Sequence, residues 1–200
     1  MDFCKYFLYN IIKEMGKHMK KCKFAPYMCY KDIYKIDYNK LYSDGVKIIL
    51  FDLDNTIIGY HETLPSEEDK LFITSLKERG FIPVIMSNNH TDRIENVAAF
   101  LNVDKLSNAK KPLKFGYKKI LKRYSEYRPE QFVAIGDQIV TDIWGASRMN
   151  IKGILVKPIR LDNEKWYTRF NRRIEKFIIK HKIKKYNIEL YKTILDVKGE

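Results

Sequence analysis

The feature that most constrains the fold of this 200-residue chain is a short apolar segment that ends in two carboxylates, Val46 to Thr56. An apolar run of this length is too short for a typical helix and is typical of a strand buried on both faces, as in a parallel sheet. Asp52 and Asp54 then follow the carboxyl end of that strand, where open α/β sheets bind their ligands. If the chain turns after Phe51, both carboxylates can reach one site, as an anionic nucleophile and an acid–base group beside a hard cation.

The two acids could also be no more than the polar end of a strand, because Asp and Asn are common turn residues. The context favours a functional role, since the acids directly follow a hydrophobic strand and precede Asn55 and Thr56. We therefore treat Asp52 and Asp54 as candidate active-site residues.

Strand-like and helix-like segments alternate through the middle of the chain. Short apolar runs predict buried strands, and apolar residues at three- and four-residue spacing predict helices. This alternation is typical of βαβ units, so the predicted fold class is α/β, with a doubly wound, Rossmann-type parallel sheet. The predicted strands are 46–51, 81–86, 132–135 and 153–156, and the predicted helices are 67–79, 91–101, 113–124 and 139–149, with a brief strand possible within 102–111.

Local signals refine two of these elements. Ser66 and Asp69 have the spacing of a helix N-cap and capping box, and Gly80 suits the end of the same helix. Pro83 removes one backbone donor from the second strand, which makes an interior position in the sheet less favourable. Three apolar residues of the first helix are expected to face the core: Leu71, Phe72 and Leu76.

Polar residues follow the ends of three predicted strands. The carboxyl ends of parallel strands share one edge of a sheet, so we expect these residues to meet there, with Lys111 among them. Several carboxylates, a hydroxyl and a lysine would bind Mg²⁺ and a phosphoryl group together, because Mg²⁺ prefers oxygen ligands. The candidates are Asp52, Asp54, Asn55 and Thr56 after the first strand, Ser87 and Asn88 after the second, and Gly136, Asp137, Thr141 and Asp142 after the third.

Four motifs in this order resemble those of the haloacid dehalogenase (HAD) superfamily of phosphatases: DxDNT and Ser after strands, Lys-Pro, and GDQxxTD. Within it, the chain is most similar to the YqeG family of subfamily IIIA phosphatases, which resembles phosphatidylglycerophosphatases. Further features extend the resemblance to about residues 24–176, among them MSNN, AKKP and Arg172-Arg173-Ile174-Glu175.

The resemblance implies a role for each motif residue. Asp52 would carry an aspartyl-phosphate, and Asp54 would protonate the leaving oxygen and then activate water. Asp52, the Asp54 carbonyl and Asp137 would hold Mg²⁺. Ser87 and the Asn88 backbone N–H would bind the phosphoryl group, and Thr56 would contact the substrate. Lys111 would compensate charge. Asp142 would either support the metal shell or orient Lys111.

The spacing of the motifs leaves no room for an inserted cap domain. The stretches from Asp52 to Ser87 and from Ser87 to Lys111 each hold little more than a loop and one helix. A capless site is open and could accept a phosphate on a lipid head group. The resemblance therefore implies a Mg²⁺-dependent phosphomonoester hydrolase, with phosphatidylglycerophosphate as the favoured substrate and phosphatidylglycerol as the product. The alternatives are a phosphatase of a soluble metabolite and a non-catalytic, RNA- or ribosome-associated protein of the same fold.

Charge and cysteine content bear on partners and location. The net charge of +13 makes polyanions plausible partners, but the intact acids Asp52, Asp54 and Asp137 argue against an RNA-binding protein that has lost its activity. Three cysteines without a disulfide framework suit a reducing compartment. No apolar run approaches the ~18 residues of a membrane span. We expect a cytoplasmic protein, with peripheral contact to the inner face of a membrane as an option.

The ends of the chain flank the predicted core of 46–160. Residues 1–45 are predicted to be an extension that packs on the core, in which 1–23 form a basic amphipathic helix and 24–45 an irregular lead-in. That helix could lie on an anionic membrane or pack on protein, and the sequence leaves both open. Residues 161–200 are predicted to hold a basic amphipathic helix over 164–185 and a tail.

Overall fold

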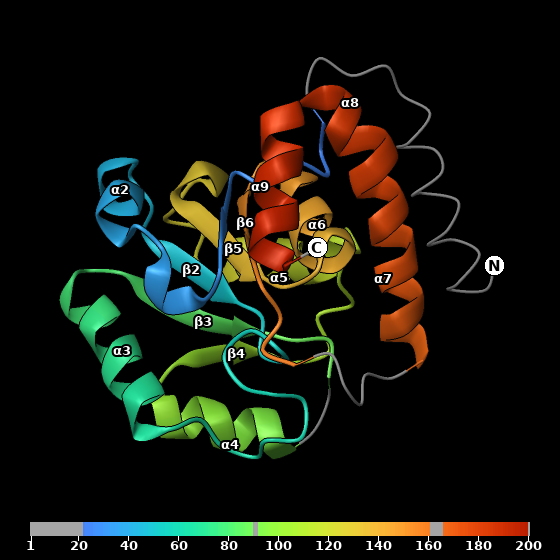
Figure 1. Ribbon diagram of the computed structural model, residues 1–200. Helices are drawn as coiled ribbons and strands as arrows, with labels where there is room; N and C mark the ends of the chain where they lie inside the picture. The colour runs from blue at the N-terminus through green and yellow to red at the C-terminus, as the bar shows by residue number, and fades with distance from the viewer. Residues whose placement is uncertain (1–21, 90–91, 161–165, 200) are drawn as a thin grey trace.

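The computed structural model describes residues 22–89, 92–160 and 166–199, and the six strands in these residues form one parallel sheet (Figure 1). Their order across the sheet is β1-β6-β5-β2-β3-β4. This arrangement confirms the predicted α/β fold with a doubly wound parallel sheet. The strands are β1 (Met28–Tyr30), β2 (Ile48–Phe51), β3 (Ile82–Met86), β4 (Asp104–Leu106), β5 (Phe132–Gly136) and β6 (Lys152–Val156).

The winding of the sheet reverses beside β2. From β2 the chain moves outward through β3 and β4, and it then returns to β5 on the other side of β2 and continues outward to β6. Open α/β sheets bind their ligands at such a switch point, outside the carboxyl ends of the strands. Asp52 follows β2 and Asp137 follows β5, so the topology brings these two acids to neighbouring positions.

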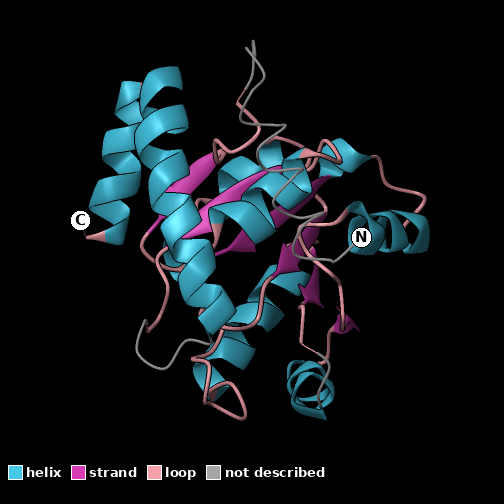
Figure 2. Cartoon of the chain, turned by 90° about the vertical axis from the view of Figure 1, so that its right-hand side faces the viewer, coloured by secondary structure: helices cyan, strands magenta, loops and turns pink. Residues whose placement is uncertain are grey.

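Helices cover both faces of the sheet (Figure 2). Ile49 and Phe51 of β2 belong to the core cluster that includes residues of α2, α3 and α4, whereas Ile48 and Leu50 belong to the cluster with α5 and α6. Successive residues of β2 therefore pack on opposite faces, which explains why the whole strand is apolar. The helices are α2 (Tyr38–Ser43), α3 (Glu67–Glu78), α4 (Asp92–Leu101), α5 (Lys114–Arg123) and α6 (Gly145–Ser147), the last preceded by a π-helical turn, Ile139–Trp144.

The C-terminal residues form a helical layer beside β6. It consists of α7 (Trp166–Ile178), a π-helical turn (Ile179–Ile183), α8 (Lys184–Tyr186) and α9 (Ile188–Lys198). Ile178 and Ile183 pack into a cluster with Phe24 and Trp144. The helix predicted over 164–185 is confirmed from residue 166 onward, but two of its aromatic residues, Phe170 and Phe177, are exposed. The sequence did not predict α9.

The segment before the first predicted strand is more regular than expected. The prediction of an irregular lead-in over 24–45 is wrong, because this segment holds β1, a 3₁₀ turn at Ile33–Lys35 and α2. Strand β1 is only three residues long and pairs with β6 at the edge of the sheet. No alternating apolar pattern in the sequence predicts it. The amphipathic segment predicted over 1–23 lies almost entirely outside the described residues. The predicted division into 1–45, 46–160 and 161–200 stays a prediction.

Two local predictions on α3 and β3 are corrected. Leu71 is 69% exposed, because α3 turns Ile73 and Leu76 toward the sheet instead. Strand β3 lies in the interior of the sheet despite Pro83. Ile82 donates to Lys47 on the β2 side, so the missing donor of Pro83 faces the β4 side, where pairing begins one residue later.

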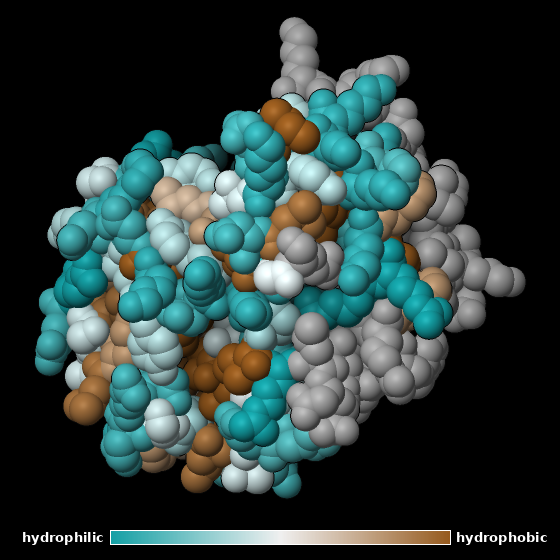
Figure 3. All heavy atoms as spheres, in the orientation of Figure 1, coloured by the Kyte–Doolittle hydropathy of each residue, from teal (hydrophilic) through white to brown (hydrophobic). Residues whose placement is uncertain are grey.

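Among the described residues, no helix is both long and apolar enough to cross a membrane. The face seen in Figure 3 is largely hydrophilic, with separate apolar patches between polar side chains.

The capping box of α3 leads to a first prediction. The Ser66 hydroxyl accepts from the Asp69 backbone N–H at 3.1 Å, and the Asp69 carboxylate accepts from the Ser66 backbone N–H at 2.8 Å. We expect Ser66→Ala to lower the free energy of unfolding by about 1 kcal/mol, because it removes the hydroxyl that accepts from the Asp69 N–H and donates to the Asp69 carboxylate. Urea unfolding measures the change. Thr74→Ala is the control, since the exposed Thr74 hydroxyl bonds only within the helix.

Candidate active site

A tight turn after β2 brings the two acids to one edge of the sheet. The carbonyl of Leu53 accepts backbone hydrogen bonds from Thr56, Ile57 and Ile58. Asn55 has a φ of 62°, a left-handed conformation that Asn tolerates better than most residues. Strand β2 therefore ends at Phe51 and the chain turns over residues 53–58, which agrees with the prediction that a turn after this strand lets both acids reach one site.

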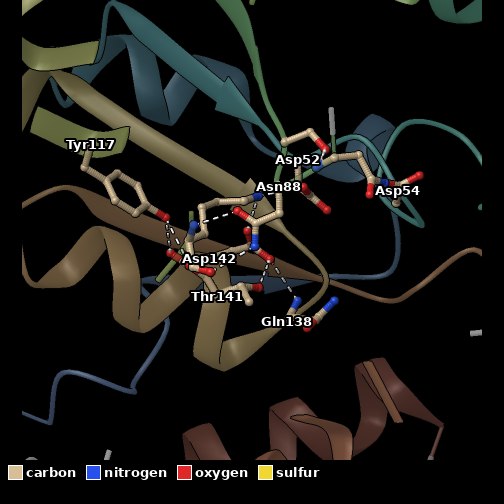
Figure 4. A network of polar contacts seen from close by, with 10 residues as sticks. Asp52, Asp54, Asn88, Tyr117, Gln138, Thr141 and Asp142 are labelled. Atoms are coloured by element: carbon tan, nitrogen blue, oxygen red, sulfur yellow. Dashed lines mark hydrogen bonds and ion pairs between the residues drawn. The ribbon is translucent and has the colours of Figure 1, made fainter. Parts of the chain in front are cut away.

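Lys111 lies between two buried carboxylates, those of Asp52 and Asp142, which are labelled in Figure 4. Its Nζ is 2.6 Å from Asp52 Oδ1 and 2.7 Å from Asp142 Oδ1. Lys111 is 5% exposed and Asp142 is 2% exposed, so water screens these contacts weakly. The predicted lysine and two of the predicted acids are thus brought together by the fold.

Burial and charge act against each other in this cluster. Burial raises the pKa of Asp52 well above its usual range, and Lys111 offsets only part of that effect. Burial also raises the pKa of Asp142, again opposed by Lys111. For Lys111 burial alone would lower the pKa, but Asp142 and Asp52 outweigh it and the pKa is raised. Lys111 therefore stays cationic, and a further cation would favour the ionised carboxylates.

Asp137 completes a set of acids that could hold a metal ion. Oxygen atoms of Asp52, Asp137 and Asp142 lie within 4.8 Å of one another. Asp137 is fully buried, and within the described residues its Oδ1 has no hydrogen-bond partner. A buried carboxylate oxygen without a donor is costly unless a cation binds it. The oxygen-rich donor set fits a hard divalent cation such as Mg²⁺.

Asp142 is held by more donors than the other two acids. Its Oδ2 accepts from the Thr141 hydroxyl at 3.0 Å and from the Gln138 backbone N–H at 3.2 Å. Gly136 makes this approach possible, because a Cβ there would lie 2.3 Å from Asp142 Cγ. Both oxygens of Asp142 therefore have protein donors, which favours orientation of Lys111 over direct metal binding.

The residues after β3 surround Lys111 from another side. Ser87 is buried and its Oγ accepts from the Asn89 backbone N–H at 3.1 Å. The side chain of Asn88 donates to the Lys111 carbonyl at 2.9 Å and accepts from the Lys111 N–H at 2.6 Å. Thr56 is also buried, and its hydroxyl has no hydrogen-bond partner within the described part of the chain. The clamp on Lys111 is a side-chain function of Asn88 that the sequence did not predict.

Comparison with known proteins identifies the family. The model of the haloacid dehalogenase-like hydrolases matches residues 30–150. The chain belongs to this family. It is 33% identical over 163 residues to the probable phosphatase YqeG of Bacillus subtilis (strain 168), a match that covers 80% of this chain and 92% of the relative. This haloacid dehalogenase-like hydrolase is therefore an enzyme of the phosphatase type, which implies a phosphorylated substrate.

Solved structures of phosphatases show a looser likeness. One is the cobalt-bound deoxy-D-mannose-octulosonate 8-phosphate phosphatase YrbI of Haemophilus influenzae, with a TM-score of 0.48, 14% identity, and coverage of 80% of this chain and 92% of that one. Another is the 3-deoxy-D-manno-octulosonate 8-phosphate phosphatase of Moraxella catarrhalis with magnesium, phosphate and KDO, with a TM-score of 0.44, 16% identity, and coverage of 60% and 83%. Both TM-scores are below 0.5, so the fold of the hydrolase is established by the strand order and parallel pairing of its own sheet.

Several polar contacts at the site were not predicted. Arg93, on the first turn of α4, forms an ion pair with Asp54, and the Asn89 side chain donates to the other oxygen of Asp54. Arg172 of α7 forms an ion pair with Asp137 and donates to its carbonyl at 3.0 Å. Arg172 was among the residues on which the resemblance to the YqeG family was based, whereas nothing in the pattern around Arg93 pointed to the site.

A buried glutamate joins the C-terminal helices to the same network. Glu175 of α7 accepts from the Val140 backbone N–H at 3.3 Å and lies 3.4 Å from Lys198 Nζ and 3.7 Å from Arg172. Burial raises its pKa, while Lys198 and Arg172 oppose that shift. Helices α7 and α9 are therefore tied through Glu175 and Arg172 to the loop that carries Asp137.

Proposed function

We propose that this hydrolase is a Mg²⁺-dependent phosphomonoesterase that acts through a phosphorylated Asp52. The observation that carries the proposal is a buried cluster in which Lys111 bridges Asp52 and Asp142, while one oxygen of Asp137 has no donor among the residues that the structure describes. Asp52, Asp137 and the Asp54 carbonyl would hold Mg²⁺, with Asp142 behind them. When bound, the ion would neutralise charge on the phosphoryl group.

The side chains would divide the reaction into two steps. A carboxylate oxygen of Asp52 forms a bond to phosphorus, the bond from phosphorus to the leaving oxygen breaks, and Asp54 gives that oxygen a proton. Asp54 then takes a proton from the water that attacks phosphorus, and phosphate and free Asp52 result. Lys111 stays cationic throughout and offsets the charge of the transferring group. Ser87, the backbone N–H of Asn88 and Thr56 would contact the phosphoryl oxygens and the substrate.

We propose phosphatidylglycerophosphate as the substrate and phosphatidylglycerol as the product. The similarity to the YqeG family favours this choice, and the capless site supports it, since within the described residues the segments between the motifs hold only the loop 57–65, α3, α4 and short β elements. The exposed side of α7 presents Phe170 and Phe177 beside basic side chains, a composition suited to peripheral contact with an anionic bilayer.

Phosphate release from phosphatidylglycerophosphate in mixed micelles tests the substrate. We expect Mg²⁺-dependent turnover with a kcat/KM at least about 100-fold above that for the same head group without acyl chains, because remote binding energy raises kcat/KM. A panel of soluble sugar phosphates and nucleotides runs beside it. Equal or better turnover of the deacylated compound or of a soluble metabolite would contradict the lipid assignment and leave the chemistry in place.

A further inference from the structure

We propose that Arg93 is a positioning residue that fixes the acid–base group Asp54 and the loop 57–65 on a single guanidinium. The side chain of Arg93 binds Asp54 Oδ1, the Gly59 carbonyl at 2.9 Å and, through Nε, the Glu62 carbonyl. The inference rests on the acid–base role proposed for Asp54 and adds the residue that would hold it in place.

Asp54 needs such support because of where it lies. Its side chain is 17% exposed at the margin of the polar network, whereas Asp142 is almost fully enclosed. A general acid must stay within hydrogen-bond reach of the leaving oxygen. Arg93 and Asn89 bind different oxygens of the Asp54 carboxylate, so together they fix both its position and its plane. Each carboxylate oxygen has a second lone pair, which leaves capacity for the transferred proton.

The same guanidinium also fixes the loop beside the site. The two carbonyls that Arg93 binds belong to Gly59 and Glu62. The Glu62 carboxylate in turn accepts a hydrogen bond from the Gly59 backbone N–H at 2.8 Å. Within the described chain no cap domain lies between the motifs, and Arg93 links the loop 57–65 directly to Asp54. Arginine suits this task because its planar guanidinium carries five donors in a rigid arrangement, which lysine lacks.

Leaving-group dependence separates positioning of the acid from other roles. A good leaving group such as 2,4-dinitrophenolate needs no proton, whereas phenolate and alkoxide depend on the general acid. We expect Arg93→Met to lower kcat/KM for phenyl phosphate on the order of 10- to 100-fold and that for 2,4-dinitrophenyl phosphate less than about threefold. Arg93→Lys should fall between wild type and Arg93→Met, and backbone amides of 59–62 should exchange hydrogen faster in both variants.

The chain offers a matched control. Arg123 also bridges a carboxylate and a carbonyl, at 2.6 Å to Asp104 and 2.9 Å to Lys105, on the edge strand β4. Arg123→Met should leave the ratio between the two esters unchanged. Asp54→Asn is measured beside it and should show the same selective loss as Arg93→Met, only larger.

Each other outcome has a definite meaning. An equal loss for both esters in Arg93→Met, or a rise in KM alone, would overturn the inference and make Arg93 a structural or phosphate-binding residue. If Asp54→Asn itself shows no selective loss, the acid–base role of Asp54 falls and the inference falls with it. Selective loss in Asp54→Asn without any in the Arg93 variants would overturn the inference alone. Should Arg93→Met fail to fold, Arg93→Lys gives the same comparison.

Discussion

Asp52→Asn is expected to lower phosphatase turnover by about 10,000-fold or more, the largest effect of any single substitution in this hydrolase. The amide keeps the shape of the side chain but is a poor nucleophile, and it is a weaker ligand for a divalent cation than a carboxylate. Phosphate release from p-nitrophenyl phosphate at saturating Mg²⁺ measures the loss. Acid quenching of the wild type during turnover should trap protein carrying one phosphoryl group, and mass spectrometry should find none on the variant.

The stability of the same variant separates chemistry from folding. Burial raises the pKa of Asp52, so at any pH above the pKa of an aspartate in the unfolded chain this group makes the folded state less stable. A neutral Asn removes that cost, and Lys111 keeps Asp142 as a partner. In the absence of Mg²⁺ we therefore expect Asp52→Asn to unfold at the same or a higher urea concentration than wild type. Turnover by a folded Asp52→Asn protein close to the wild-type rate would remove Asp52 as the nucleophile.

The sequence predicted the parts of the fold that local patterns carry. The apolar run that ends at Phe51 had only one favourable environment, a strand covered on both faces, and the acids after it had to lie at the sheet edge. The stripe on α4 was also correct, with Ile94, Val97 and Leu101 buried. Strand β1 escaped prediction because three residues pairing only with β6 at the edge carry no periodic signal.

The unpredicted part of the site consists of side-chain contacts between distant segments. Arg93 reaches Asp54 across 39 positions of sequence, and Arg172 reaches Asp137 across 35. A lone arginine on a helix is usually a solvated residue, so its spacing carries no information about a partner that only the tertiary fold supplies. The role of Asn88 was missed for the same reason. Asn88 follows β3, whereas its partner Lys111 lies in the segment between β4 and α5.

Lys111→Met is expected to cause the second-largest loss, about 100- to 1,000-fold in kcat/KM. Without the ammonium, Asp52 and Asp142 face each other in a site where burial already raises the pKa of both carboxyls. Loss of the ammonium removes the group that opposes this rise, so the pKa of Asp52 rises further, and a protonated Asp52 is no nucleophile. The variant should also lose about 3 kcal/mol or more of folding stability in Mg²⁺-free buffer, because two buried acids remain without their cation.

A neighbouring lysine and a double variant make this prediction specific. Lys110 precedes Lys111 in the sequence, but it is exposed and its Nζ lies over the Phe115 ring, so Lys110→Met should keep near wild-type turnover. Adding Asp142→Asn to Lys111→Met should restore much of the lost stability, because Asp142 is then no longer a buried acid without its cation. It should leave turnover low, because the ammonium that offset the charge of the phosphoryl group is still missing. Stability and activity would then respond differently to the same second substitution. If both recovered together, Lys111 would serve only to hold the buried acids in the fold.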